Sequence, residues 1–226
     1  MKYSAFQDVM SDIRLDRYLT ASGNNSRKAM TLYRKNLKLC QELFTVISCF
    51  EIALRNRIDR HYISIHGNDW LRDSVRPDGI FSTVPTKQTH KIINTCLSRL
   101  TTYNHSKLVA EMDFGFWRYL FASPQFKTAG QSLLKVFPNK PSSTPTLQYN
   151  HTYVFNHLDQ INHIRNRIAH HEPICFRPKL PIKDTTYARQ RYNVILQFFK
   201  WLNIDEATLL YGLDHISPVC DEIDRL

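Results

Sequence analysis

The segment from Asn162 to Pro173 holds the densest set of side chains that could do acid–base chemistry. Histidine titrates near neutral pH, and arginine grips phosphate oxygens through a planar fork. His170 could therefore transfer a proton while Arg165 stabilises negative charge on a phosphate. Asn166 precedes His170 by four residues, so on a helix it could touch and orient that histidine. The spacing predicts a catalytic set of Arg165, Asn166 and His170, with His171 as the alternative histidine.

Neighbouring polar side chains could support this site or be purely structural. Arg167 and His171 form an i,i+4 pair, and His163 shares the polar helix face. The competing interpretation is a polar helix end, in which the histidines satisfy local groups and Glu172 pairs with an arginine. Residue types alone leave both interpretations open. We expect no metal here, because His170, His171 and Cys175 match no standard zinc spacing.

A helix that Pro173 terminates is expected to position these side chains. The apolar residues of this helix fall on one stripe: Val154, Leu158, Ile161, Ile164 and Ile168. Arg165 lies near the middle of that stripe, where a guanidinium needs a partner or a cleft. This placement is reasonable if the stripe near Arg165 meets a second subunit.

Apolar residues recur at helical spacing along most of the chain, and no strand alternation competes with them. Helices are expected over residues 4–22, 26–66, 87–103, 106–122, 125–136, 147–171 and 184–203, followed by two short helices. Segments rich in proline or glycine predict long loops at about 67–86, 137–146 and 172–183. We predict an all-α fold that forms one domain over residues 1–226.

Composition excludes several classes of protein. The chain is 42% hydrophobic and 12% aromatic, which excludes disorder, and its 6 glycines leave little material for nucleotide-binding loops. The 5 cysteines lack CxxC spacing, so we expect neither a disulfide framework nor a metal or other cofactor, and the natural compartment is a reducing cytosol. No apolar stretch predicts a signal peptide or a membrane span.

The charge of the chain favours a polyanionic partner. Lys and Arg number 30 against 20 Asp and Glu, giving a net charge of +10. Five basic residues share one face of the helix expected over 26–66, and we call them the basic stripe: Arg27, Lys28, Arg34, Lys35 and Lys38. The stripe could bind RNA phosphates or could be an ordinary solvated face. The stretch from Asp205 to Asp224 has six acids and no Lys or Arg.

Several blocks of this sequence resemble a known family. The hexapeptide from Arg165 to His170, RNRIAH, matches the signature of the HEPN superfamily of helical ribonucleases: arginine, a polar residue, three further residues and histidine. Its context, RNRIAHHEPI, is similar to the Abi-like abortive-infection branch. Three upstream blocks follow in the order expected for that branch: FEIALRNRI at 50–58, Trp70-Leu71 and DFGFWRYLF at 113–121. The resemblance covers most of residues 26–175.

The resemblance implies a HEPN-like helical bundle, a homodimer with its active site at the shared interface, and metal-independent RNA cleavage in phage defence. RNA carries its own nucleophile, the ribose 2′-OH, so a site needs only a proton acceptor, a proton donor and a cation. In this chemistry His170 is the general acid/base, Arg165 stabilises the transition state, and Asn166 orients His170 or the phosphate. A toxic enzyme also needs a neutralising partner, which could be RNA or protein.

Two other functions stay open. One is a non-catalytic RNA-binding protein on the same scaffold, regulated by a structured RNA, and the other is a helical protein-interaction module. The stretch from Arg55 to His61 also has an arginine and a histidine at a permitted spacing, and could be a second centre or a support for the first. Glu51, Arg55 and Asp59 could instead form a salt-bridge ladder.

The aromatic run at 114–121 is expected to pack in the core rather than stack on bases.

Overall fold

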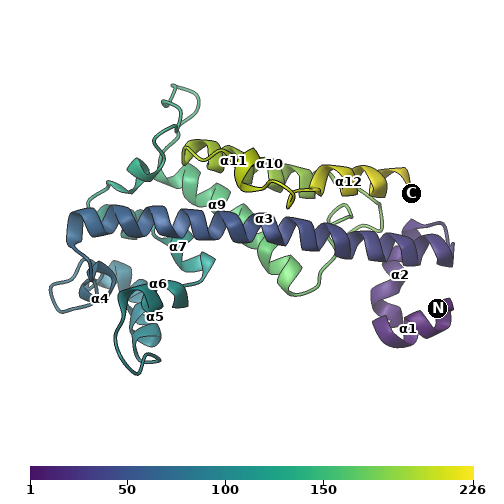
Figure 1. Cartoon of the computed structure of the whole chain (residues 1–226), viewed down its shortest axis with the longest axis horizontal. Helices are drawn as coiled ribbons and strands as arrows, with labels where there is room; N and C mark the ends of the chain where they lie inside the picture. Colours follow the sequence, from purple (N-terminus) through teal and green to yellow (C-terminus); the bar gives the residue numbers. More distant parts are fainter. The chain divides into compact units, whose positions relative to one another are not determined.

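The computed structural model describes residues 1–226, and every regular element in it is helical (Figure 1). The α-helices are α1 (Tyr3–Met10), α2 (Asp12–Ala21), α3 (Ser26–His66), α4 (Trp70–Asp73), α5 (Lys87–Leu97), α6 (His105–Glu111), α7 (Phe114–Tyr119), α8 (Ser123–Thr128), α9 (His151–Ala169), α10 (Thr186–Trp201), α11 (Glu206–Leu209) and α12 (Ile216–Arg225). Two 3₁₀ turns, η1 (Val84–Thr86) and η2 (Leu133–Val136), join them. The prediction of an all-α fold is confirmed. None of these helices offers a stretch long and apolar enough to span a bilayer.

The chain divides into two compact units. Unit 1 comprises residues 1–48, 163–196 and 206–226, and unit 2 comprises 49–162 and 197–205. Helices α3, α9 and α10 each contribute residues to both units. One domain over residues 1–226 stays a prediction.

Helix α3 has the bounds that the sequence predicts, Ser26 to His66. The Asn25 side chain accepts a hydrogen bond from the Lys28 amide at 3.0 Å, and Gly67 follows the last turn with φ at 88°. No proline or glycine interrupts the 41 residues between them. Apolar residues recur every three or four positions and are almost fully buried: Leu32, Leu39, Leu43 and Val46 in unit 1, and Phe50, Leu54, Ile58 and Tyr62 in unit 2.

In unit 1, aromatic and amide contacts attach other segments to α3. The ring of Tyr18 in α2 meets the rings of Tyr33 and Phe176 edge-on, with centroids 5.0 and 4.9 Å away. Asn36 is buried on α3, and its Oδ1 accepts a hydrogen bond from the Ile174 amide at 3.0 Å. The segment after α9 is therefore fixed to the long helix.

In unit 2, aromatic side chains build the core, as expected for the run at 114–121. The rings of Phe50 and Phe199 pack edge-on with centroids 5.4 Å apart. Phe114, Phe116, Trp117 and Phe121 are all at most 2% exposed. These rings are therefore not available for stacking on bases.

Asp59 does not join the ladder expected with Glu51 and Arg55. Its Oδ1 accepts hydrogen bonds from the Trp70 indole and the His105 imidazole, each at 2.8 Å. The buried indole N–H of Trp70 needs a hydrogen-bond acceptor, and the Asp59 carboxylate supplies it.

Some predicted helix bounds are wrong. The helix expected over 4–22 is broken at Ser11, whose φ is 68°, and the one over 106–122 is broken before Asp113. Asp113 caps α7 by accepting a hydrogen bond from the Phe116 amide at 2.8 Å. The predicted loop at 67–86 contains α4 and η1, whereas no helix interrupts residues 137–150 or 172–183.

Gly79 closes the turn after α4, and we expect its replacement by alanine to destabilise unit 2. A Cβ there would lie 2.3 Å from the Ser74 carbonyl oxygen, which accepts a hydrogen bond from the Phe81 amide. Overpacking of this kind costs about 1–3 kcal/mol, so Gly79→Ala should lower the urea midpoint followed by circular dichroism. Gly115→Ala is the control, because its Cβ meets only the Asp113 side chain and alanine favours the helix. Equal midpoints for the two variants would contradict the steric argument.

Candidate functional site

The predicted catalytic segment forms the end of α9, and its backbone hydrogen bonds define a Schellman cap. The amide of His171 donates to the Ile168 carbonyl at 3.0 Å, and the amide of Glu172 donates to the Arg167 carbonyl at 2.8 Å. His171 takes the left-handed conformation that this cap requires, with φ at 57°. The helix expected to reach residue 171 ends at Ala169, so His170 and His171 both belong to the cap.

The predicted catalytic side chains lie close in the chain but are only partly joined. Arg165 Nη1 donates to Asn166 Oδ1 over a long 3.4 Å, while Arg165 Nε is buried without a hydrogen-bond partner. Asn166 and His170 are exposed, and no hydrogen bond joins the His170 imidazole to either of its predicted partners. The buried Nε agrees with the expectation that Arg165 would need a partner on the apolar stripe.

The two supporting residues Arg167 and His163 differ in their surroundings. Arg167 Nε donates to Glu172 Oε2 at 3.2 Å, its Nη2 donates to the Pro173 carbonyl at 2.6 Å, and its guanidinium lies 5.3 Å from the centre of the Tyr187 ring. Arg167 therefore pairs with Glu172 rather than with His171, and it ties the helix end to the segment that follows. His163 is exposed on α9.

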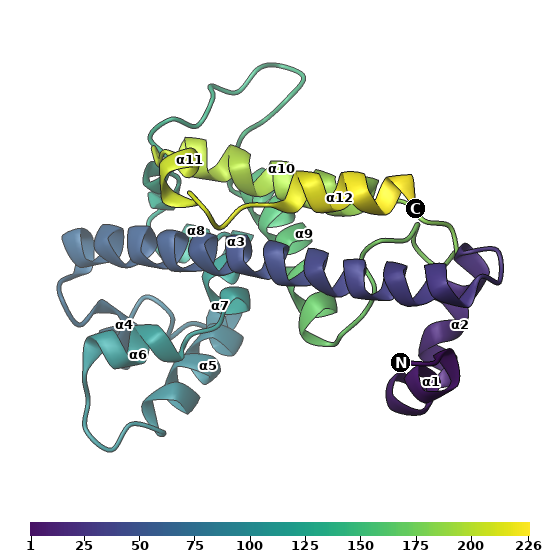
Figure 2. The same cartoon turned by 45° about the vertical axis from the view of Figure 1, so that its right-hand side comes forward.

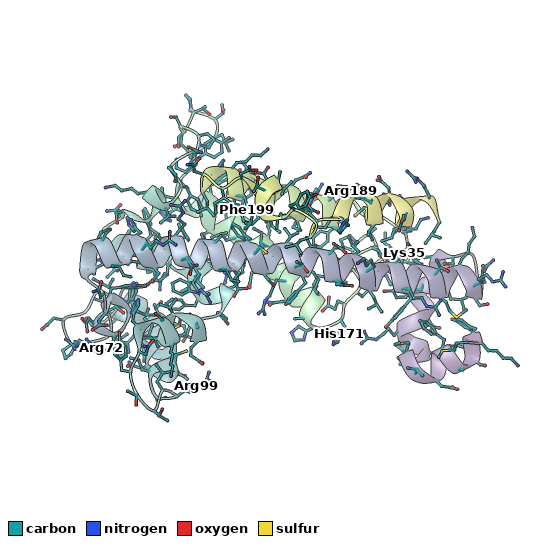
Figure 3. All side chains as sticks on the ribbon, in the orientation of Figure 1. Lys35, Arg72, Arg99, His171, Arg189 and Phe199 are labelled. Carbon is teal, nitrogen blue, oxygen red and sulfur yellow. The ribbon has the colours of Figure 1, made fainter.

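A hollow of about 420 Å³ opens in unit 1 beside the two cap histidines. It is lined by the junction of α1 and α2, by α2 and by the end of α9: Ser11, Ile13, Arg14, Arg17, His170, His171, Glu172 and Pro173. We call it the cap hollow. Figure 3 labels His171 at the end of the green helix, and Figure 2 shows α1 and α2 from a second side.

Two arginines of α2 bind main-chain oxygens of the segment after α9. Arg14 Nη1 donates to the His171 carbonyl at 2.8 Å. Arg17 Nη2 donates to the carbonyls of Arg177 and Leu180 at 2.8 and 2.6 Å, and its guanidinium lies 4.6 Å from the centre of the Phe176 ring. Sequence reasoning missed both arginines, because these contacts span more than 150 residues of chain and follow no local spacing.

Positive charge is concentrated around this hollow. Burial, and then the nearby charge of Arg167, lower the pKa of the Arg17 guanidinium below its ordinary value. The one acid that lines the hollow, Glu172, is paired with Arg167. Cys175 is fully buried, and burial raises the pKa of its thiol.

The basic stripe of α3 is partly neutralised within unit 1. Lys35 pairs with Glu222 of α12, Lys38 pairs with Glu42 at 2.6 Å, and Lys28 Nζ donates to the main-chain oxygen of Leu226 at 3.1 Å. The views in Figures 1 and 2 both show α12 alongside α3. Figure 3 labels Lys35, which belongs to α3. Of the acids noted near the end of the sequence, Glu222 thus lies against the stripe, whereas Asp221 and Asp224 pair with Arg189 of α10.

The other two stripe residues have no acidic partner. Arg34 is exposed, and its guanidinium lies 5.3 Å from the centre of the Phe6 ring, while Arg27 is exposed and makes no ion pair. At Glu42, burial alone would raise the pKa, but hydrogen bonds from Lys38 and His215 hold it below its usual value. The stripe therefore divides into paired lysines and unpaired arginines.

The echo of the motif in unit 2 is mainly engaged in structural contacts. His61 Nε2 lies 2.9 Å from Ser132 Oγ, and Arg57 Nη2 donates to the Leu202 carbonyl at 3.2 Å. Burial, and then the charges of Lys135 and His66, lower the pKa of His61. Arg55 Nε is buried without a partner.

Comparison with known proteins identifies the family. A family model described as Abi-like protein matches residues 2–175, a span that contains α2, the stripe, the end of α9 and the whole cap hollow. A search of curated proteins and a search of solved structures find no match. Since the family model covers well over half of the chain, this protein belongs to the Abi-like protein family.

Proposed function

We propose that this chain is a metal-independent endoribonuclease of the HEPN type that acts as a toxin in abortive infection. Abi-like proteins are associated with that form of phage defence. The observation that carries the proposal is the end of α9, where an exposed histidine, an asparagine and a partly buried arginine stand in HEPN spacing beside a cationic hollow. The partner of such a toxin would be a neutralising RNA or protein.

The proposed reaction uses the 2′-OH of the substrate as nucleophile. His170 takes the 2′ proton, the 2′ oxygen attacks the adjacent phosphorus, and the bond to the 5′ oxygen breaks. The leaving oxygen takes a proton from a second histidine, which is His171 or His170 of a second copy. The products are a 2′,3′-cyclic phosphate and a 5′-OH. Arg165 binds the non-bridging phosphate oxygens, on which charge grows.

RNA binding without cleavage is the second candidate function. It is favoured by the exposed guanidinium groups of Arg27 and Arg34 on one face of α3, and by the lack of a hydrogen bond between His170 and its predicted partners. Incubation with labelled total RNA separates the two candidates. A module that binds only protein would retain no RNA at low salt.

Replacing His170 with alanine should abolish most RNA cleavage. Loss of a general acid/base lowers the rate by about 10²- to 10⁴-fold, and loss of the charge of Arg165 by about 10²- to 10³-fold. Cleavage by the wild-type protein should persist in EDTA, and should stop when the nucleotide 5′ to the scissile phosphate is 2′-deoxy. His66→Ala, at the end of α3, is the control for loss of an exposed histidine. This mechanism would be ruled out if cleavage requires Mg²⁺, if the protein cuts DNA as well as RNA, or if cleavage survives both His170→Ala and Arg165→Ala.

The choice between the two cap histidines can be tested through backbone conformation. Glycine takes the left-handed conformation of residue 171 without strain, so His171→Gly removes the imidazole and keeps the cap. If His170 is the base and His170 of a second copy is the acid, His171→Gly should reduce cleavage by less than tenfold and should not lower the unfolding temperature. A larger loss in His171→Gly than in His170→Ala would assign the role to His171.

A homodimer is expected from the partly buried Arg165, whose Nε lacks a partner within its own chain. Two-fold packing near α9 would place two copies of the arginine and histidine in one cleft. Sedimentation velocity at micromolar concentration should give twice the monomer mass. A monomer that cleaves RNA at the same concentration would contradict this assembly.

The basic stripe should bind RNA mainly through its unpaired arginines. Changing Arg27 and Arg34 to Gln should weaken RNA binding and lower the slope of log K against log salt by about 0.7 for each phosphate of a single strand that the protein no longer neutralises. The same change at Lys35 and Lys38, whose charges are already paired, should have a smaller effect. Identical slopes for the wild type and the arginine double variant would make the stripe an ordinary solvated face.

A further inference from the structure

We propose that the cap hollow binds one nucleotide of single-stranded RNA, with a phosphate on Arg14 and the base against Ile13. This inference rests on the proposed function, because it places substrate beside His170. It assigns a binding role to α2, a helix outside the HEPN-like motif. Arg14 has free donors, Ile13 has an exposed side chain, and the hollow has an excess of positive charge.

Arg14 is placed and equipped to bind a phosphate. One of its nitrogens, Nη1, is engaged by the His171 carbonyl at 2.8 Å, which fixes the guanidinium beside the cap histidines. Its Nε and Nη2 have no protein partner, and the side chain is exposed on the wall of the hollow. A guanidinium held at one corner presents its remaining N–H groups as a rigid pair, the geometry that phosphate oxygens accept.

The charge around Arg14 favours an anion. Arg17 lies in the same wall, fixed by the carbonyls of Arg177 and Leu180, and burial together with the charge of Arg167 lowers its pKa. Glu172 is the one acidic residue that lines the hollow, and its carboxylate forms an ion pair with Arg167. The wall thus carries two guanidinium groups and two imidazoles without a free counter-charge.

Ile13 supplies an apolar surface at the same opening. Its side chain is 89% exposed, the most exposed of the large hydrophobic side chains apart from Tyr211, which is equally exposed. A nucleobase has an apolar face that could cover this side chain while its phosphate stays at Arg14. The volume of about 420 Å³ falls in the range of roughly 300–1,000 Å³ that is typical of small-molecule sites.

Binding should be measured with the full chain and a fully 2′-O-methyl oligoribonucleotide, which cannot be cleaved through its 2′ position. Arg14→Gln removes the charge and keeps a polar side chain with an N–H donor. It should raise Kd at least fivefold and lower the salt slope by about 0.7. Arg225→Gln, an exposed arginine of α12 in the same unit, is the charge-matched control. Thermal melts of both variants check that the cap is intact.

A second pair of variants tests the base-binding surface. Ile13→Ser should raise Kd at least threefold with an unchanged salt slope, and Val9→Ser, another exposed aliphatic residue of unit 1, is its control. In cleavage assays Arg14→Gln should raise KM severalfold and change kcat less than twofold. A free nucleoside monophosphate should compete with the oligonucleotide in the wild type and not in Arg14→Gln.

Each outcome decides the inference. Variants at 13 and 14 that bind like their controls would overturn it, even if the wild type cleaves RNA. Weakened binding of uncleavable RNA in a chain without ribonuclease activity would keep the hollow and reject the enzyme. If Ile13→Ser changes the sedimenting mass and leaves Kd unchanged, the hollow is covered by a second copy and the inference is wrong.

Discussion

The apolar face of α3 must be buried, and the arrangement of the residues around the site follows from that constraint. A 41-residue helix with side chains such as Leu39, Leu43 and Phe50 on one face is stable in water only when other segments cover that face. In unit 1 the cover brings Asn36 to the Ile174 amide, which sets the course of the chain after α9. That course allows the cap at His171 and brings its carbonyl to Arg14.

The basic side chains around the site differ in how many of their hydrogen-bond donors are bound to the protein itself. Arg167 and Arg17 donate hydrogen bonds from two or more positions to carboxylate and carbonyl oxygens of their own unit. The His170 imidazole makes no hydrogen bond, and Arg14 donates through one nitrogen only. Because the cap is held by backbone hydrogen bonds, the imidazoles are not needed to stabilise it. The histidines therefore remain available for proton transfer without loss of the local fold.

The helices and the motif could be predicted from local signals, whereas the surroundings of the site could not. Asn25 and Gly67 mark the ends of α3, and Pro173 marks the end of the motif helix within a few residues. The break at Ser11 has no such signal, since serine rarely takes a φ of 68° and nothing nearby in the sequence requires it. The contacts of Arg14 and the pair of Lys35 with Glu222 join residues more than 150 positions apart. Such pairs depend on how the helices pack, which no spacing of residue types records.

In the segment after α9, the stretch at 177–182 is held by hydrogen bonds from Arg17 to main-chain oxygens, whereas Ile174, Cys175 and Phe176 before it are fully buried. Residues 177–182 are exposed, and Arg17 donates to two of their carbonyls. Segments with few buried apolar contacts open at a lower free energy than the core of the same protein. The stretch at 177–182 can therefore open while the buried face of α3 keeps its helix. Heating should then release this stretch from Arg17 before the helix content falls.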